Sequence, residues 1–553
     1  MKIRITALDQ KPMFRVYSSA MNIRKITESV QADLPYEILA CKIDNVSSSL
    51  DTVIDRDCTL ELLDLRSPVA NMAYQDSLSM LYLRAVHDVY GSQVSVTIAN
   101  SLNKGVFTVI HAGGIDDAGI RRISGRMQEL VREDEKFIQR RVDRAELLET
   151  LAQTDKKDTL RLVESAEELQ YAQVVTFAGE SDVFYNLLVP SAGYLKWFDV
   201  RRYKNGVLIR FPQPSMPDAL MPYRDESCLY DAFSEETRWD RIMGVRTAAD
   251  LNAKVKDGSY RDLIMLSEAL HEKKIADIAD LIKQQKKRIV LIAGPSSSGK
   301  TSFAKRLCIQ LRVNGLRPLY LGTDDYFKER SETPLDENGE KDYESLRAVD
   351  TDLFNRDLND LLAGRKVDIP TFDFRQGTKI FGQRITSIDA AQPIVIEGIH
   401  ALNRGLTEHI EETEKFRIYI SPLTQLNIDD HNRISTTDAR MLRRMVRDYQ
   451  FRGHDVRDTI DSWPKVRAGE EKYIFPYDNE GDVFFNSQCL YELSVLKKYA
   501  KPLLEEVQPG EPQYAEASRM LSFLEFFETI EDDAIIPNNS IMREFIGGSV
   551  LVH

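Results

Sequence analysis

The chain is poor in cysteine and has no long apolar run. Its 553 residues include five cysteines, Cys41, Cys58, Cys228, Cys308 and Cys489, none in a C-x-x-C pair. This spacing disfavours a zinc site or a disulfide framework and favours a reducing compartment. No apolar run approaches the ~20 residues of a membrane-spanning helix, and the amino terminus has strand-like alternation in place of a signal peptide. We therefore expect a cytoplasmic protein without membrane contact.

Positive charge is also in deficit. The formal net charge is -14, which argues against wrapping of nucleic acid over a large surface, because the phosphates would be repelled. An anionic ligand therefore needs a local cationic site. The length and the ordinary balance of apolar and charged residues predict a globular chain with several cores and about three domains. Whether it forms a homo-oligomer stays open.

Five segments follow one another along the chain. Residues 1–66 mix short strand-like stretches with a helical stretch near 23–32. Residues 67–230 mix strand patterns at 94–99 and 107–111 with helical patterns at 78–89 and 120–151. A helical connector is predicted at 231–285, alternating strands and helices at 286–510, and a carboxyl-terminal tail at 511–553. The predicted fold is multidomain, with two α+β modules preceding a parallel α/β sheet.

A glycine-rich loop follows the apolar run at 288–293. It reads Gly-Pro-Ser-Ser-Ser-Gly-Lys-Thr over 294–301 and leads into helical spacing. In a strand–loop–helix unit of this kind, backbone N–H groups and the helix terminus bind phosphates. A chance glycine–serine turn is the alternative, and the flanking patterns argue against it. We expect ATP to be bound by Gly294, Pro295, Ser296, Ser297, Ser298, Gly299, Lys300, Thr301 and Ser302, with Lys300 on the β- and γ-phosphates and Thr301 on Mg²⁺.

Acids stand at the carboxyl ends of the next two predicted strands, where open α/β sheets bind ligands. Asp324 and Asp325 follow the apolar segment 318–322, and Glu397 follows 392–396. Asp324 is the candidate that orients or deprotonates an acceptor hydroxyl, with Asp325 as a metal or supporting partner; the alternative is that both cap the next segment. Glu397 is expected to approach Mg²⁺ through water, or else to be structural. His400 is expected to pack or to form hydrogen bonds.

Four arginines occupy one face of a predicted helix at 438–448. Arg440, Arg443, Arg444 and Arg447 stand at i, i+3, i+4 and i+7, which predicts a cationic stripe. A solvated face is the alternative. We expect the stripe, joined by Arg452, to close over ATP and to stabilise charge on the transferred phosphoryl group.

Together these motifs, with an aromatic motif at 369–374, resemble the uridine/cytidine kinase and phosphoribulokinase group. The resemblance implies that Asp324 is the catalytic base and that Arg443, Arg444 and Arg447 are lid arginines. It also implies that the acceptor is bound by Asp324, Phe327, Glu344, Phe372, Phe374 and Arg440. Pyrimidine kinases place a base-reading histidine after the aromatic motif, whereas this chain has Arg-Gln-Gly-Thr-Lys at 375–379. Arg375 and Lys379 would suit an anionic acceptor such as a sugar phosphate.

The amino-terminal half resembles two other modules. Residues 1–66 are similar to a β-grasp-like TGS domain, and 67–230 to the editing-type second domain of threonyl-tRNA synthetase. That family has an H-x-x-x-H motif, and Asp76 and Met80 stand at the aligned positions. The whole order resembles uridine kinase-like nucleoside kinases with a TGS domain. We expect a nucleoside kinase; the alternatives are a kinase of another small acceptor and an ATP-dependent switch whose amino-terminal half binds RNA.

Overall fold

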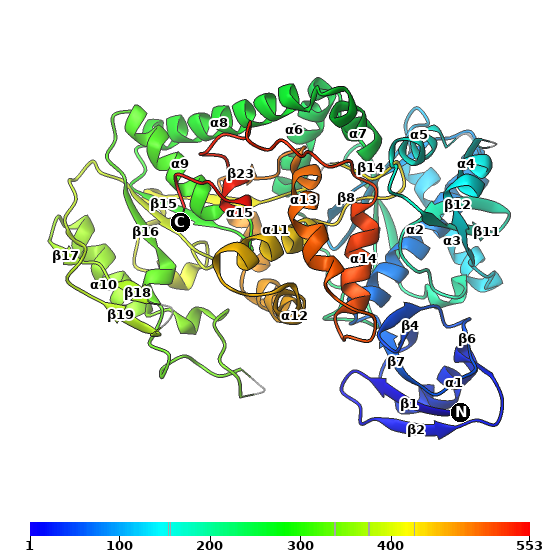
Figure 1. Cartoon of the computed structure of the whole chain (residues 1–553). Coiled ribbons are helices and arrows are strands. Elements are labelled where there is room, and N and C mark those ends of the chain that lie inside the picture. Colours follow the sequence, from blue (N-terminus) through cyan, green and yellow to red (C-terminus); the bar gives the residue numbers. More distant parts are fainter. Residues whose placement is uncertain (153, 155, 337–338, 374–375, 425, 553) are drawn as a thin grey trace.

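The structure, a computed structural model, describes the chain apart from residues 153, 155, 337–338, 374–375, 425 and 553. In Figure 1 the amino-terminal module lies at the lower right and the second module at the right. The parallel sheet lies left of centre, beneath the long helix α8 (Tyr260–Gln284).

The first module is a five-stranded mixed sheet with one helix. Its elements are β1 (Lys2–Ala7), β2 (Met13–Val16), β3 (Met21–Asn22), α1 (Ile23–Val30), β4 (Ile38–Ile43), β5 (Val46–Ser48), β6 (Val53–Ile54) and β7 (Cys58–Asp64). The strand order is β2-β1-β7-β4-β5, with β1 and β7 parallel. Alternation along β1 points Ile3 and Ile5 into a core shared with Ile26 of α1, as expected for a half-buried strand. The TGS assignment stays a prediction.

The second module has two antiparallel sheets, ordered β10-β11-β12 and β13-β14-β9-β8. Its elements are α2 (Pro68–Tyr90), β8 (Val96–Leu102), β9 (Gly105–Ile110), α3 (Asp117–Glu133), β10 (Ile138–Asp143), α4 (Arg144–Ala152), α5 (Lys157–Ser165), β11 (Tyr171–Phe177), β12 (Glu180–Phe184), β13 (Asp199–Tyr203) and β14 (Gly206–Arg210). The prediction of one helix over 120–151 is wrong between the end of α3 and the start of α4. Helix α3 ends where Asp134 takes a left-handed φ of 50°, and β10 follows as an edge strand paired with β11.

Helices α6 (Ser227–Met243), α7 (Ala248–Asp257) and α8 connect this module to the parallel sheet. The remaining elements are β15 (Ile289–Ala293), α9 (Lys300–Val313), β16 (Leu319–Gly322), α10 (Thr351–Leu362), β17 (Val367–Asp368), β18 (Thr371–Asp373), β19 (Thr378–Ile380), β20 (Ile385–Thr386), β21 (Ile394–Glu397), β22 (Lys415–Ser421), α11 (Thr436–Phe451), α12 (Val456–Tyr473), β23 (Val483–Asn486), α13 (Glu492–Glu505), α14 (Tyr514–Leu524) and α15 (Arg543–Ile546).

The predicted parallel sheet is confirmed, with strand order β16-β21-β15-β22-β23 and parallel pairing throughout. Successive residues of β15 enter different cores: Val290 packs with α8 and α9, and Leu291 packs with α10. Both faces are therefore covered, which explains the unbroken apolar run. Among the described helices, none combines the length and apolarity that a membrane crossing requires.

Candidate active site

The glycine-rich loop lies at the carboxyl end of β15, the central strand of the parallel sheet. Gly294 passes so close to β22 that a Cβ there would lie 2.0 Å from the carbonyl oxygen of Ile420. Ser297 and Gly299 have left-handed φ values of 59° and 80°. The hydroxyls of Ser297 and Ser298 are buried, and within the described part of the chain they have no hydrogen-bond partner. A curled backbone with such hydroxyls forms a polar cradle that fits phosphate oxygens.

Lys300 begins α9, directly after the loop. Its Nζ donates a hydrogen bond to the carbonyl of Pro295, 3.0 Å away. Burial lowers the pKa of Lys300, and the carboxylates of Glu397 and Asp324 oppose this shift. The ammonium group is thus held inside the loop, with the two strand-end acids close enough to act on its charge.

Thr301 and Glu397 meet beside the loop. The Thr301 hydroxyl donates to Glu397 Oε2 at 3.3 Å, and the Tyr320 hydroxyl donates to the same oxygen at 3.1 Å. Burial raises the pKa of Glu397 to about 7, against the opposing charge of Lys300. Among the described residues, no group of three or more His, Cys, Asp or Glu is placed to hold a metal ion. A hydroxyl and one carboxylate nevertheless fit Mg²⁺, which keeps several waters and takes further oxygens from substrate phosphates.

The two aspartates after β16 have different surroundings. Asp324 is exposed to solvent and, as noted, acts on the charge of Lys300. Asp325 instead accepts a bond from Arg384 at 2.5 Å and from the backbone N–H of Phe372 at 3.4 Å. Asp325 therefore fixes the strand that carries Phe372, and Asp324 keeps its carboxylate accessible.

The proposed acceptor side contains Glu344, Phe327 and Phe372. Burial and the charge of Glu470 raise the pKa of Glu344 to about 7. The rings of Phe327 and Phe372 meet edge to face, with centroids 5.9 Å apart, and Phe374 lies outside the described residues. His400 is 1% exposed, and burial lowers the pKa of its ring to about 4. It packs edge to face on Tyr473 and is neutral at pH 7.

The arginine stripe lies on α11, and its first two members are buried in ion pairs. Arg440 pairs with Glu470 of α12 and donates to the carbonyl of Ser296 at 2.9 Å. Arg443 pairs with Glu492 of α13 at 2.5 Å and donates to the carbonyl of Ser297 at 3.3 Å. Both guanidinium groups therefore clamp the loop backbone, and their charge is neutralised within the protein.

The other two arginines share one carboxylate, that of Asp448. Arg444 donates to the Ser296 hydroxyl at 3.0 Å and pairs with Asp448 at 3.3 Å. Arg447 also pairs with Asp448: its Nε donates to Asp448 Oδ1 at 2.7 Å, and its Nη2 lies 2.7 Å from the same oxygen. These two remain the arginines placed to meet an anionic ligand.

Sequence reasoning missed the acids that serve this site. Glu470 is fully buried and accepts from the Ser296 N–H at 3.0 Å as well as from Arg440. Glu492 was not singled out either. Their only signal was indirect, because a buried arginine requires an anionic partner, and local spacing does not show which distant acid supplies it.

The second module contacts the segment that leads into α11. The contacts from residues 427–433 include Asn427 Nδ2 to the Ile98 carbonyl (2.9 Å), His431 Nδ1 with Asp182 (2.6 Å), Asn432 Nδ2 to the Val183 carbonyl (2.9 Å) and Arg433 to Gln75 (2.8 Å). We call residues 427–433 the clasp. The clasp ends shortly before α11, which begins at Thr436.

Asp76 and Met80, the positions aligned with the editing histidines, lie on α2 of the second module. Asp76 accepts from Asn186 at 2.9 Å, and burial raises its pKa to about 6. Met80 is fully buried in the core of the second module.

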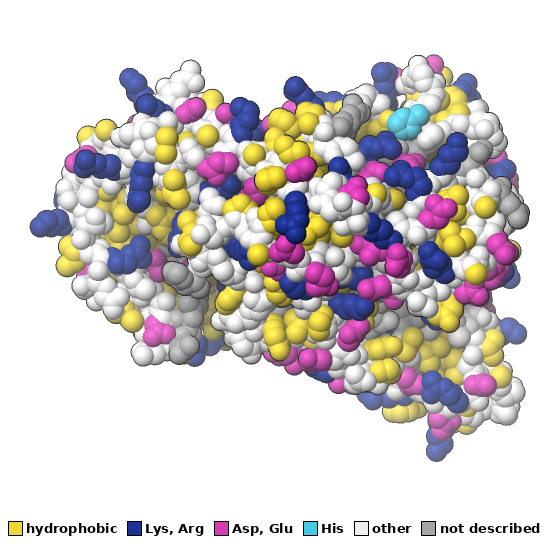
Figure 2. All heavy atoms as spheres, turned by 45° about the horizontal axis from the view of Figure 1, so that its top comes forward, with side chains coloured by type: hydrophobic (Ala, Val, Ile, Leu, Met, Phe, Trp, Pro, Cys, Tyr) yellow, Lys and Arg dark blue, Asp and Glu magenta, His cyan; other side chains and the backbone are white. Residues whose placement is uncertain are grey.

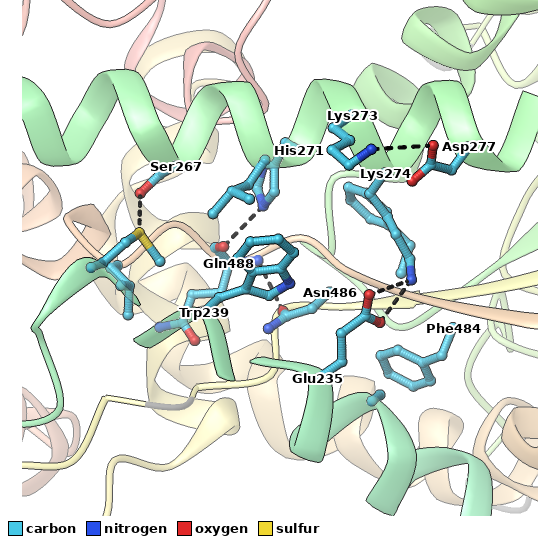
Figure 3. Close-up of a pocket in the computed structure, with 15 residues that line it drawn as sticks. Glu235, Trp239, Ser267, His271, Lys273, Lys274, Asp277, Phe484, Asn486 and Gln488 are labelled. Carbon is cyan, nitrogen blue, oxygen red and sulfur yellow. Dashed lines mark hydrogen bonds and ion pairs between the residues drawn. The ribbon is translucent and has the colours of Figure 1, made fainter. Parts of the chain in front are cut away.

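A further pocket lies between α6, α8 and the end of β23 (Figure 3). Trp239 and Glu235 from α6 face His271 and Lys274 from α8. Lys274 pairs with Glu235 at 2.7 Å, and His271 contacts the carbonyl of Gln488 at 3.1 Å. The pocket lining includes no residue predicted from sequence to form the site.

Comparison with known proteins identifies the part of the chain that carries this site. Residues 289–493 match the model of the Phosphoribulokinase / Uridine kinase family. A uridine kinase of Staphylococcus epidermidis is 30% identical over 196 residues, which are 35% of this chain and 85% of that protein. A uridine kinase of Leuconostoc citreum is 25% identical over 221 residues, which are 39% of this chain and 97% of that protein. A solved structure of a possible uridine kinase from Bacillus stearothermophilus is 23% identical, covers 24% of this chain and 70% of its own, and has a TM-score of 0.21. The loop, the strand-end acids and the arginine helix all fall within the matched range, and the chain belongs to the phosphoribulokinase / uridine kinase family of ATP-dependent kinases.

Proposed function

We propose that the chain transfers the γ-phosphate of Mg·ATP to the 5'-hydroxyl of a uridine-like nucleoside. The observation that carries the proposal is the order of three strands. β21 pairs with both β15 and β16, so the phosphate loop, Glu397 and Asp324 stand at one edge of the sheet. Open α/β sheets bind ligands at this edge.

In this proposal each side chain has one role. Lys300 binds the phosphates, and Thr301 and Glu397 hold Mg²⁺, which when bound neutralises charge between them. Asp324 orients the acceptor hydroxyl and accepts its proton, which its accessible carboxylate permits. Arg444 and Arg447 stabilise negative charge on the phosphoryl group. Glu344, Phe327 and Phe372 bind the acceptor.

An uncharged acceptor fits better than a sugar phosphate. Lys379, one of the two cations that suggested an anionic acceptor, donates to Asp350 at 2.7 Å and is 9% exposed. Arg375, the other, lies outside the described residues. With Lys379 neutralised and Glu344 beside the acceptor, this side of the site favours hydroxyl groups over phosphate.

A panel of acceptors with Mg·ATP tests the proposal. ADP formation would be measured with uridine, cytidine, purine nucleosides and sugar phosphates, each against a reaction without acceptor. We expect the largest acceptor-dependent rate with a nucleoside. A larger rate with a sugar phosphate would overturn the nucleoside assignment and leave the kinase chemistry standing.

We also propose that the TGS-like and synthetase-like modules regulate the kinase by binding RNA. The clasp supports this, because it joins the second module to the helix that holds the phosphate loop. Basic and acidic side chains are mixed over the face in Figure 2, so an RNA contact on this face would be restricted to a small area. RNA titration of the full chain, with and without ATP, should show salt-sensitive binding that ATP changes. Absence of binding at low salt would refute this role.

A further inference from the structure

The carboxyl-terminal segment returns to the phosphate loop. α15 and its neighbours, red in Figure 1, lie beside α11 and β23. Ile541 and Phe545 are fully buried in the core that contains β15 and α9. Ile541 packs on the loop itself, since a Cβ on Gly299 would lie 2.5 Å from its Cγ2. These residues belong to the predicted carboxyl-terminal tail, 511–553, and pack against the phosphate loop.

Glu544 of this segment binds the first turn of α9. Its Oε2 accepts from the Ser302 hydroxyl at 2.6 Å and from the Ser302 backbone N–H at 3.3 Å. The first N–H groups of a helix have no partner within the helix, and the helix dipole favours an anion there. In a phosphate loop, these N–H groups bind phosphate oxygens. The chain's own carboxylate therefore holds a phosphate subsite.

The charges around Lys300 make this occupancy costly for a nucleotide. Glu397, Asp324 and Glu544 are the acids that act on its buried ammonium group. A phosphate entering beside Glu544 meets a like charge and must take over the Ser302 donors. ATP thus binds in competition with Glu544, and its apparent affinity falls with the fraction of molecules in which Glu544 has moved away.

Anchors on both sides of Glu544 keep the segment in place when its side chain moves. The Ser540 hydroxyl donates to Glu268 at 2.6 Å, and Phe545 lies under the guanidinium of Arg443, 4.9 Å from the ring centroid. Lys305 of α9 donates to the carbonyl of Leu551. Rotation of one side chain is therefore sufficient to release Ser302, and the helix α15 stays packed.

We infer that Glu544 is an affinity-determining residue for ATP, which it excludes from the Ser302 subsite until nucleotide displaces it. The inference rests on the ATP-dependent kinase assignment. It predicts that the wild-type chain binds ATP more weakly than a variant that lacks the Glu544 charge.

The test is a calorimetric titration of the full chain with ATP and, separately, with adenosine. Glu544→Gln keeps the shape and removes the charge, and Glu531→Gln removes the same charge from an exposed position on the same segment. We expect Glu544→Gln to lower the Kd for ATP by about tenfold, as for a site open in roughly one molecule in ten. The Kd for adenosine should not change, and Glu531→Gln should match the wild type for both ligands.

An unchanged or raised Kd for ATP in Glu544→Gln would overturn the inference. So would an equal fall of the Kd for ATP in Glu531→Gln. An equal fall of the Kd for adenosine in Glu544→Gln would also overturn it, because it would indicate that the segment opens as a whole. Thermal unfolding verifies the fold. If Glu544→Gln does not fold, Glu544→Asp, which shortens the side chain, is tested against the same outcomes. Acceptor-dependent ADP formation is measured separately, so a wrong acceptor assignment leaves the binding result intact.

Discussion

Glu470→Gln removes the charge that neutralises Arg440 and holds the phosphate loop. Arg440 is 1% exposed and Glu470 is fully buried, and breaking such a pair from one side costs about 3–5 kcal/mol, because the remaining charge is uncompensated. The amide still accepts one hydrogen bond, which places the expected loss of unfolding free energy near the lower limit, at about 3 kcal/mol.

Glu471→Gln is the matched control, since it changes the adjacent residue of the same helix. The Glu471 side chain is 35% exposed and pairs with Lys104 and Arg467, each at 3.2 Å. Exposed pairs contribute about 0–1 kcal/mol, so this variant should unfold close to the wild type.

Urea denaturation followed by tryptophan fluorescence measures both variants. Trp463 lies on α12 with Glu470, and the Arg440 guanidinium lies 5.4 Å from the centroid of its ring. Of the three tryptophans, Trp463 is therefore the one whose part of the signal reports on the clamped helix pair. Equal destabilisation by both variants, or wild-type stability of Glu470→Gln, would refute the account of the arginine stripe as a neutralised clamp.

Two further predictions concern the reaction. Lys300→Ala should abolish phosphoryl transfer without unfolding the chain, because it removes a charge directed at the phosphates; turnover near the wild-type rate would contradict this. Transfer should rise with pH through about 7, where Glu344 and Glu397 ionise, and Glu344→Gln should raise the KM for the acceptor and remove part of this rise. Because the pKa of Glu344 is raised from 4.5 to about 7, the folded state holds this proton more tightly than the unfolded state does. The contribution of Glu344 to the free energy of unfolding therefore falls as the pH rises from 4.5 to about 7. An unaltered pH profile in Glu344→Gln would refute the role of Glu344 in binding the acceptor.

The phosphate loop and the strand-end acids could be predicted because their signals are local. An apolar run, a glycine loop and helical spacing together define the unit around Lys300, and the apolar strands deliver Asp324 and Glu397 to the same edge. The parallel order of the sheet then brings these residues together, which alternation of strands and helices already indicates.

Contacts between distant residues could not be predicted in the same way. The four arginines of α11 were expected to meet anionic ligands, but Arg440 and Arg443 are neutralised by acids 30 and 49 positions later. The charged sequence of β10 contains no helix-breaking residue, so the helix predicted at 120–151 ran through it. The pairing of β10 with β11 is a contact between distant residues that the local pattern does not show. Glu544 lies in a tail whose local pattern gives no indication that it returns to Ser302.

The central claim is that Asp324 acts on the acceptor and not on ATP. Asp324→Asn keeps the shape and removes the base, with Asp325→Asn as the neighbouring control that instead loses its bond to Arg384. ATP binding and acceptor-dependent ADP formation should be measured on the same preparation of each variant. The account predicts that transfer by Asp324→Asn falls by roughly 10²–10⁴ while the Kd for ATP is nearly unchanged. Loss of ATP binding together with transfer, or loss of neither, would contradict it.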